Sequence, residues 1–146
     1  RALAPQTWEL RLAGFNNGRT IHIPLPPLIE VESVKYYDID DALQTLPADD
    51  YEVNGVGGFG RGRVLLKHGR QWPAVGTRAE NVVVRFRAGY VTDDSPQAVN
   101  VPAPILTALK RQVAAMYENR EAVVVNSTVA KLPGGVEALL APLRVW

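Results

Sequence analysis

The chain has 146 residues, of which 47% are hydrophobic and 21% charged, with a formal net charge of +1 at pH 7. These values are typical of one globular domain of ordinary size. The absence of cysteine excludes a disulfide framework and a thiolate metal site. No apolar run approaches the roughly 18 residues of a transmembrane helix, and the sequence pattern leads us to expect no signal peptide.

The first two thirds of the chain read as short strands separated by turns. Residues 7–12 alternate apolar and charged side chains, which is typical of a half-buried strand, and Asn17-Gly18 predicts a turn after it. The alternation is clearest over 81–88, where Val82, Val84, Phe86 and Ala88 share one face. Further strands are expected at 20–23, 29–38, 44–46, 51–53 and 64–67. A polar stretch, 92–97, then leads into a helix.

The only long helical pattern begins after residue 101. Six apolar side chains share one face of that helix at intervals of three or four residues: Ile105, Leu106, Leu109, Val113, Met116 and Tyr117. Pro102 and Pro104 stand near the start, where a missing N–H costs little. We therefore predict a helix over 101–122 that acts as the hydrophobic spine of a small domain.

Strands followed by a helix are the order of an α+β fold. We expect 1–5 to be the remnant of a preceding helical segment, and 6–100 to form a compact antiparallel β unit. The spine helix follows, and 123–146 forms a loop, a short amphipathic helix and a C-terminal tail. Pro133-Gly134-Gly135 is the expected hinge of that tail.

Charge is separated along the chain. Eight acids lie between Glu30 and Glu52 against one lysine, and five bases without an acid lie between Arg61 and Arg78. Two solvated loops explain this pattern. A second interpretation is a subunit with one acidic and one basic edge, which stacks head to tail on copies of itself and can close into a ring.

The glycine-rich stretch 55–60 matches G-x-G-x-x-G. A dinucleotide site requires a helix to begin at these glycines, whereas the residues that follow are typical of loop and strand. A flexible hairpin loop is therefore the favoured interpretation. The loop from Gly58 to Arg63 could also contact nucleic acid, because Arg61 and Arg63 on a pliable backbone beside one aromatic residue suit phosphates and stacked bases.

The chain lacks a convergent set of catalytic or metal-binding residues. Asp38, Asp40 and Asp41 lack the remaining spacing of a calcium loop and are read as a hairpin turn. His22 and His68 are isolated, and no serine or carboxylate spacing links them to a nucleophile. We therefore predict that the protein is not an enzyme and holds no cofactor or metal.

A set of short fragments in a particular order resembles the tailed-phage head–tail connector (adaptor) family, which includes adaptors of gene transfer agents. The fragments are 8–12 (WELRL), 14–15, 21–24 (IHIP), 26–28, 31–34, 36–38, 51–53, 72–73, 84–86, 88–90, 101–102, 117–121 (YENRE) and 139–146 (LLAPLRVW). Their joint order spans nearly the whole chain, and the last two are the most specific.

The resemblance implies a non-enzymatic structural protein at the head–tail junction of a virion or phage-like particle, assembled in the bacterial cytoplasm. Such proteins form a ring, typically of twelve copies, between the portal and the next neck or tail (stopper) protein, with a channel through which DNA passes. No membrane partner is implied. Family members begin with further helices ahead of the Trp8 position, so the resemblance implies that this chain is a trimmed version.

The resemblance and the residue types together place the candidate interface in the C-terminal part of the chain. Arginine, tryptophan and an apolar stripe are typical of binding hot spots. The interface residues, toward the portal or a neighbouring subunit, are Arg120, Leu139, Leu140, Leu143, Arg144 and Trp146. Alternatively, the tail folds back on its own domain. Arg61 and Arg63 are candidate DNA-channel contacts, and the alternative function is a small β-rich nucleic-acid-binding module that uses the loop from Gly58 to Arg63.

Overall fold

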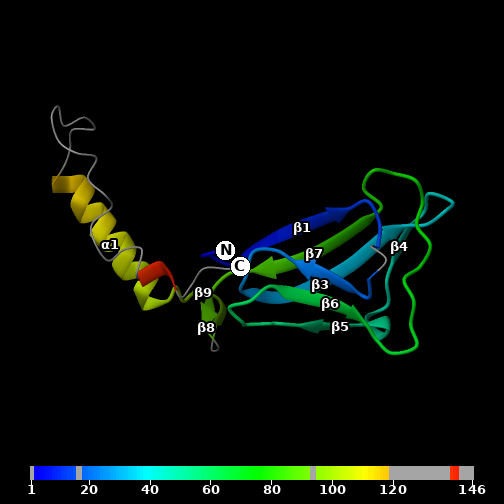
Figure 1. The fold of residues 1–146 in the computed structure, drawn as a ribbon, viewed down its shortest axis with the longest axis horizontal. Coiled ribbons are helices and arrows are strands. Elements are labelled where there is room, and N and C mark those ends of the chain that lie inside the picture. The colour runs from blue at the N-terminus through cyan, green and yellow to red at the C-terminus, as the bar shows by residue number, and fades with distance from the viewer. Residues whose placement is uncertain (1, 16–17, 93–94, 119–138, 142–146) are drawn as a thin grey trace. The chain divides into compact units, whose positions relative to one another are not determined.

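The computed structural model describes residues 2–15, 18–92, 95–118 and 139–141, and it has the α+β class that the sequence predicts (Figure 1). The elements in chain order are β1 (Gln6–Leu12), β2 (Thr20–Ile23), β3 (Leu28–Tyr37), β4 (Leu43–Thr45), the 3-10 helix η1 (Ala48–Asp50), β5 (Tyr51–Asn54), β6 (Gly62–Leu66), β7 (Val82–Ala88), β8 (Val91–Thr92), β9 (Ser95–Val99) and α1 (Ala103–Glu118). The chain divides into two compact units, Arg1–Asn100 and Val101–Trp146, and each is described by itself.

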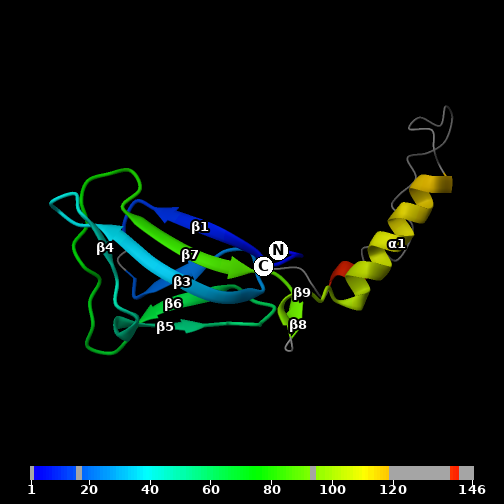
Figure 2. The ribbon, with the colours of Figure 1, turned by 180° about the vertical axis from the view of Figure 1, so that it is seen from behind.

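Two antiparallel sheets build the first unit, here called the β unit. Sheet A has the strand order β1-β7-β3-β4, and sheet B has the order β2-β6-β5, while β8 and β9 form a separate hairpin. The ribbon shows the two sheets as layers, seen from opposite sides in Figures 1 and 2. Side chains from both sheets share one hydrophobic core, so the layers pack face to face.

Alternation along the strands decides which side chains enter that core. On β7, every second residue from Val82 to Ala88 is buried, and Phe86 is 1% exposed. This is the inward face that the sequence predicts. Sheet B contributes Ile21, Ile23 and Val64 to the same cluster, and Ala2 belongs to it as well. The core therefore draws on nearly the full length of the β unit.

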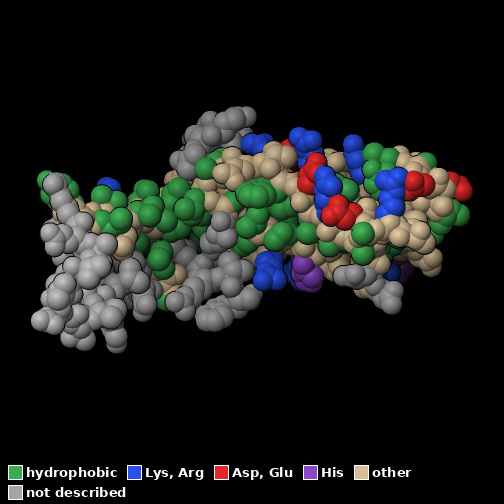
Figure 3. Space-filling model, turned by 90° about the horizontal axis from the view of Figure 1, so that it is seen from above, with side chains coloured by type: hydrophobic (Ala, Val, Ile, Leu, Met, Phe, Trp, Pro, Cys, Tyr) green, Lys and Arg blue, Asp and Glu red, His purple; other side chains and the backbone are tan. Residues whose placement is uncertain are grey.

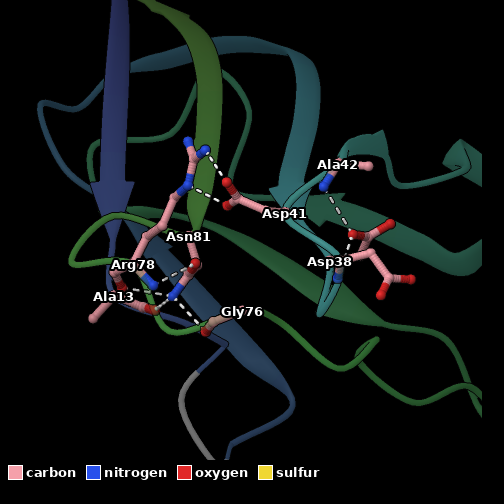
Figure 4. Close-up of polar contacts among 8 residues, drawn as sticks. Ala13, Asp38, Asp41, Ala42, Gly76, Arg78 and Asn81 are labelled. Atoms are coloured by element: carbon pink, nitrogen blue, oxygen red, sulfur yellow. Dashed lines mark hydrogen bonds and ion pairs between the residues drawn. The ribbon is translucent and has the colours of Figure 1, made fainter.

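A buried asparagine joins the loop before β7 to the rest of sheet A (Figure 4). Asn81 is 2% exposed, and its side-chain amide donates to the carbonyls of Ala13 at 2.7 Å, Gly76 at 2.9 Å and Arg78 at 2.7 Å. Its Oδ1 accepts from the Arg78 N–H at 3.2 Å. The Asn81 carbonyl accepts from the N–H of Tyr37 on β3, so one side chain and its own backbone organise the loop over 76–81.

The hairpin of β8 and β9 was not predicted. The stretch 92–97 was expected only as a polar lead into the helix, yet Val91 pairs with Val99 and Thr92 with Ser95. A two-stranded ladder of backbone hydrogen bonds does not require a buried face, so apolar alternation gives no sign of it.

The helix is confirmed, and much of its predicted apolar face is exposed in this structure, so its role as a hydrophobic spine stays a prediction. Ile105 is buried, whereas Leu109 is 51%, Val113 64% and Tyr117 70% exposed. The predicted range of 101–122 compares with Ala103–Glu118, and residues 119–122 lie outside the described part. Periodicity reveals that a helix has an apolar face, but it does not reveal what covers that face.

Candidate functional site

The exposed face of α1 forms a shallow apolar groove. It is lined by Leu106, Leu109, Lys110, Val113, Ala114 and Tyr117. Hydrophobic side chains gather along α1 in the space-filling view (Figure 3). A patch of this kind on a monomer is typical of a surface that contacts a partner. The sequence indicated the stripe, but not that it is uncovered.

The loop between β5 and β6 is a hairpin connection, as predicted. β6 begins at Gly62, directly after the loop, so the helix that a dinucleotide site needs is replaced by a strand. The loop backbone is held against β3, because the Gly57 N–H donates to the Leu28 carbonyl at 2.8 Å. A Cβ on Gly62 would lie 2.3 Å from Cδ2 of Leu28, so a larger residue here would force the Leu28 side chain to move where sheet B approaches sheet A.

Arg61 and Arg63 are exposed at the outer side of sheet B. Arg63 lies on β6 with its side chain opposite the buried positions Gly62 and Val64. It pairs in register with His22 on β2 and with Asn54 on β5, so these three exposed side chains form one row across the sheet. Arg61 precedes β6 at the end of the glycine-rich loop.

The acidic and basic stretches that the sequence suggested as separate edges are joined in part by ion pairs. Glu30 and Glu32 on β3 form ion pairs with Arg87 and Arg85 on β7, at 2.8 and 2.7 Å. Two further acids of the acidic stretch pair with bases of the basic stretch: Asp41 with Arg78, and Asp50 with Arg70. The folded chain therefore pairs part of each stretch, while Arg61, Arg63 and Lys67 form no ion pair with another described residue. Head-to-tail stacking through charged edges stays a prediction.

On the outer face of sheet A, acidic and basic side chains are interspersed (Figure 3). Arg11 on β1 adds contacts to Glu9 at 3.1 Å and Glu80 at 3.0 Å, and these hydrogen bonds, with Glu80 first, raise the pKa of the Arg11 guanidinium. Exposed pairs of this kind contribute little stability each. Their effect is a surface on which acids and bases are paired rather than separated.

The acidic turn at Asp38 is closed by its own hydrogen bonds. Its carboxylate accepts from the side chain of Gln44 at 2.9 Å and from the N–H groups of Ala42 at 2.9 Å and Asp40 at 3.0 Å. These bonds, led by the one from Gln44, lower the pKa of Asp38. Within the described ranges, His, Asp and Glu do not gather in groups of three that could hold a metal ion.

The candidate interface in the C-terminal part is described only in part. Leu139 and Leu140 are half-buried in a helical turn, followed by the exposed Ala141. Four other predicted interface residues lie outside the described residues: Arg120, Leu143, Arg144 and Trp146. Among the described helices, none is long and apolar enough to cross a membrane.

Comparisons with known proteins reveal similarity in structure. Neither a protein-family model nor a curated protein matches the sequence. A chain in the virion of a native gene transfer agent (GTA) particle has the same fold, with a TM-score of 0.71 and 23% identity over 99% of this chain and 68% of that chain. A chain in the neck of the native GTA particle, computed with C12 symmetry, matches with a TM-score of 0.70 and 22% identity over 99% of this chain and 72% of that one.

A chain in the neck of the empty GTA particle, computed with C6 symmetry, gives a TM-score of 0.69 and 21% identity, with 99% and 67% of the two chains covered. The match includes both the β unit and the C-terminal unit, because it covers nearly the whole of this chain. At 21–23% identity it establishes a common fold.

Proposed function

We propose that the protein is a head–tail connector (adaptor) of a phage or phage-like particle. Copies of the chain form a ring of twelve between the portal and the next neck or tail (stopper) protein, with a channel for DNA. The particle assembles in the bacterial cytoplasm. The observation that carries this proposal is the fold, which matches chains of GTA virion and neck structures over 99% of its length.

The surface of the chain supports a structural role. The groove on α1 exposes large apolar side chains, which is costly in water unless another surface covers them. An assembly protein needs surfaces that contact neighbouring subunits.

The ring is tested by mass. The full chain is mixed with the portal of the same particle, and the complex is measured by mass photometry and by electron microscopy of negatively stained particles. We expect rings of twelve chains seated on the portal. A chain that remains monomeric in the presence of portal at micromolar concentration would refute the connector.

The C-terminal tail is the proposed docking element toward the portal or a neighbouring copy. It contains the half-buried Leu139 and Leu140 together with Leu143, Arg144 and Trp146. Arg120, within the range expected for the helix, belongs to the same proposed interface. Deletion of 143–146 is expected to abolish portal binding and to leave the thermal unfolding of the β unit unchanged. A matched control replaces the same four residues by Gly and Ser, which preserves length. If the deletion variant binds the portal with unchanged affinity, the tail is not part of the interface. The ring is then tested by the mass measurement alone.

A small nucleic-acid-binding module is the second candidate function. It is favoured by the exposure of Arg61 and Arg63, neither of which forms an ion pair with another described residue. Sub-micromolar affinity of the monomeric chain for single strands in a filter-binding assay would favour this module. A connector is expected to bind weakly and without sequence preference, because a channel must let DNA slide.

A further inference from the structure

The arginines of the β unit fall into two groups. Five of those described form ion pairs with carboxylates: Arg11, Arg70, Arg78, Arg85 and Arg87. The other three have no carboxylate partner among the described residues: Arg19, Arg61 and Arg63. All three of these belong to β6 or lie beside β2 and β6. The arginines without a carboxylate partner among the described residues are therefore concentrated at sheet B.

Strand register assembles these charges into one surface, here called the sheet B face: Arg19, His22, Asn54, Arg61, Arg63 and Lys67. Alternate residues of a strand point to the same side and lie about 6.8 Å apart, and neighbouring strands lie about 4.8 Å apart. Arg63 is flanked by His22 and Asn54, while Arg61 and Lys67 stand just before and just after β6. Arg61, Arg63 and Lys67 thus follow the direction of β6, while His22 and Asn54 flank Arg63 across the strands.

Arg19 adds a guanidinium group beside the end of β6, where hydrogen bonds hold it. Its Nη2 donates to the carbonyls of Leu66 at 3.2 Å and Lys67 at 2.6 Å. These carbonyls orient the guanidinium but do not cancel its charge. Glu52 on β5 is the acid that shares this outer face, and it forms no ion pair with another described residue. The face keeps a net positive charge, in contrast to the ion-paired outer face of sheet A.

We propose that the sheet B face binds the phosphate backbone of nucleic acid, and that in the proposed ring it faces the DNA. The inference deepens the proposed function and depends on it only for the position of the face in the ring. Guanidinium, imidazole and amide groups in one row donate hydrogen bonds that suit phosphate oxygens.

An acidic protein is the competing occupant of a basic surface. Nucleic acid is favoured because the donors follow a line along one strand, as the charges of a phosphate backbone do. The experiment below contains an arm for each occupant.

The test measures binding of the full chain to a fluorescent 30-base-pair duplex and to a single strand of the same length, as a function of salt. Three phosphate contacts give a slope of log K against log salt of about −2.7 for duplex, and a loss of affinity of roughly 40-fold between 50 and 200 mM salt. The Arg61→Gln/Arg63→Gln variant is expected to reduce the slope to about −0.9. The matched control, Arg85→Gln/Arg87→Gln, removes two ion-paired arginines of sheet A and is expected to leave the slope unchanged.

Equal slopes for the two variants would overturn the proposal, and so would binding of polyglutamate with affinity equal to that for DNA. Ring formation on the portal, measured by mass for the same variants, distinguishes a failure of the proposed DNA contact from a failure of the proposed connector function. If the ring forms normally and the slopes are equal, the connector proposal is supported and the sheet B face is not one of its DNA contacts. A slope change without a ring supports the face and refutes the connector.

Discussion

Replacing Asn81 by aspartate tests how the loop over 76–81 is held. The substitution keeps the shape of the side chain but exchanges an N–H donor group for oxygen. In the native chain that group faces the carbonyls of Ala13, Gly76 and Arg78, each within 3 Å. An ionised aspartate at this position would place a buried negative charge against three carbonyl oxygens and would lose the bonds that they accepted.

The expected magnitude follows from the geometry. Removing the side-chain amide, as in Asn81→Ala, eliminates hydrogen bonds worth about 1 kcal/mol each and leaves buried carbonyls unpaired. We therefore expect the free energy of unfolding to fall by about 2–3 kcal/mol. At pH 7, Asn81→Asp should cost more, about 3–5 kcal/mol, because the charge is buried without a partner. Burial and the carbonyls raise the pKa of the new carboxyl group above its unfolded value.

The stability of the Asn81→Asp variant is therefore expected to depend on pH. A group whose pKa is raised in the folded state binds more protons there, so the variant loses stability as pH rises from the unfolded pKa of about 3.9. The extra cost at pH 7 therefore decreases on acidification by at most about 4 kcal/mol, and a protonated carboxyl can still donate one hydrogen bond.

Urea denaturation followed by tryptophan fluorescence at pH 7.0 and pH 4.5 measures this effect. The free energy of unfolding of Asn81→Asp is compared with that of Asn81→Ala at each pH, which cancels the acid sensitivity of the remaining chain. We expect the difference between the two variants to shrink at pH 4.5. A difference that is the same at both pH values would show that the aspartate is not desolvated against the carbonyls, and the reasoning would fail.

Three further predictions concern packing, exposure and the acidic turn. Gly62→Ala should destabilise the chain by about 1–3 kcal/mol, because its Cβ meets the side chain of Leu28 at 2.3 Å, and Leu28→Ala should recover part of that loss in a double-mutant cycle. Val113→Ser should change the unfolding free energy by less than about 0.5 kcal/mol, whereas Val84→Ala should cost about 2–3 kcal/mol; equal costs would show that the α1 face is core. Asp38 should titrate below the usual carboxyl range in an NMR titration, since a glutamine side chain and backbone N–H groups stabilise its charged form; its contribution to stability is present above about pH 3.9 and lost as pH falls through the lower folded pKa. A midpoint at the ordinary value would contradict the hydrogen bonds of this turn.

Much of the fold was predictable because its signals are local. Alternation over 81–88 identified the central strand and its buried face, and the spacing of Ile105 and Leu109 identified the helix. The hairpin after Gly55 was predicted correctly, because a strand pattern rather than a helix pattern follows the glycines. These inferences depend on the period of side chains along a strand or helix, which any short window of sequence contains.

The candidate surfaces were predictable only as residue types. Arg61 and Arg63 were singled out as bases in a glycine-rich loop, but His22 and Asn54 gave no comparable signal. They join the row only through the register of β2, β6 and β5. Which arginines remain without acidic partners depends on strand pairing, and residues from distant parts of the chain decide it.

Charge illustrates the same division most clearly. The printed sequence contains an acidic stretch and a basic stretch, and their composition alone suggests two opposite edges. Tertiary structure instead pairs Glu30 with Arg87, 57 residues away, and Asp41 with Arg78, 37 residues away. Secondary structure depends on neighbours in the chain, so its periods are visible in the sequence. The net charge of a surface, and whether other residues bury it, depend on which strands lie side by side. Strand neighbours are determined only when the sheets form.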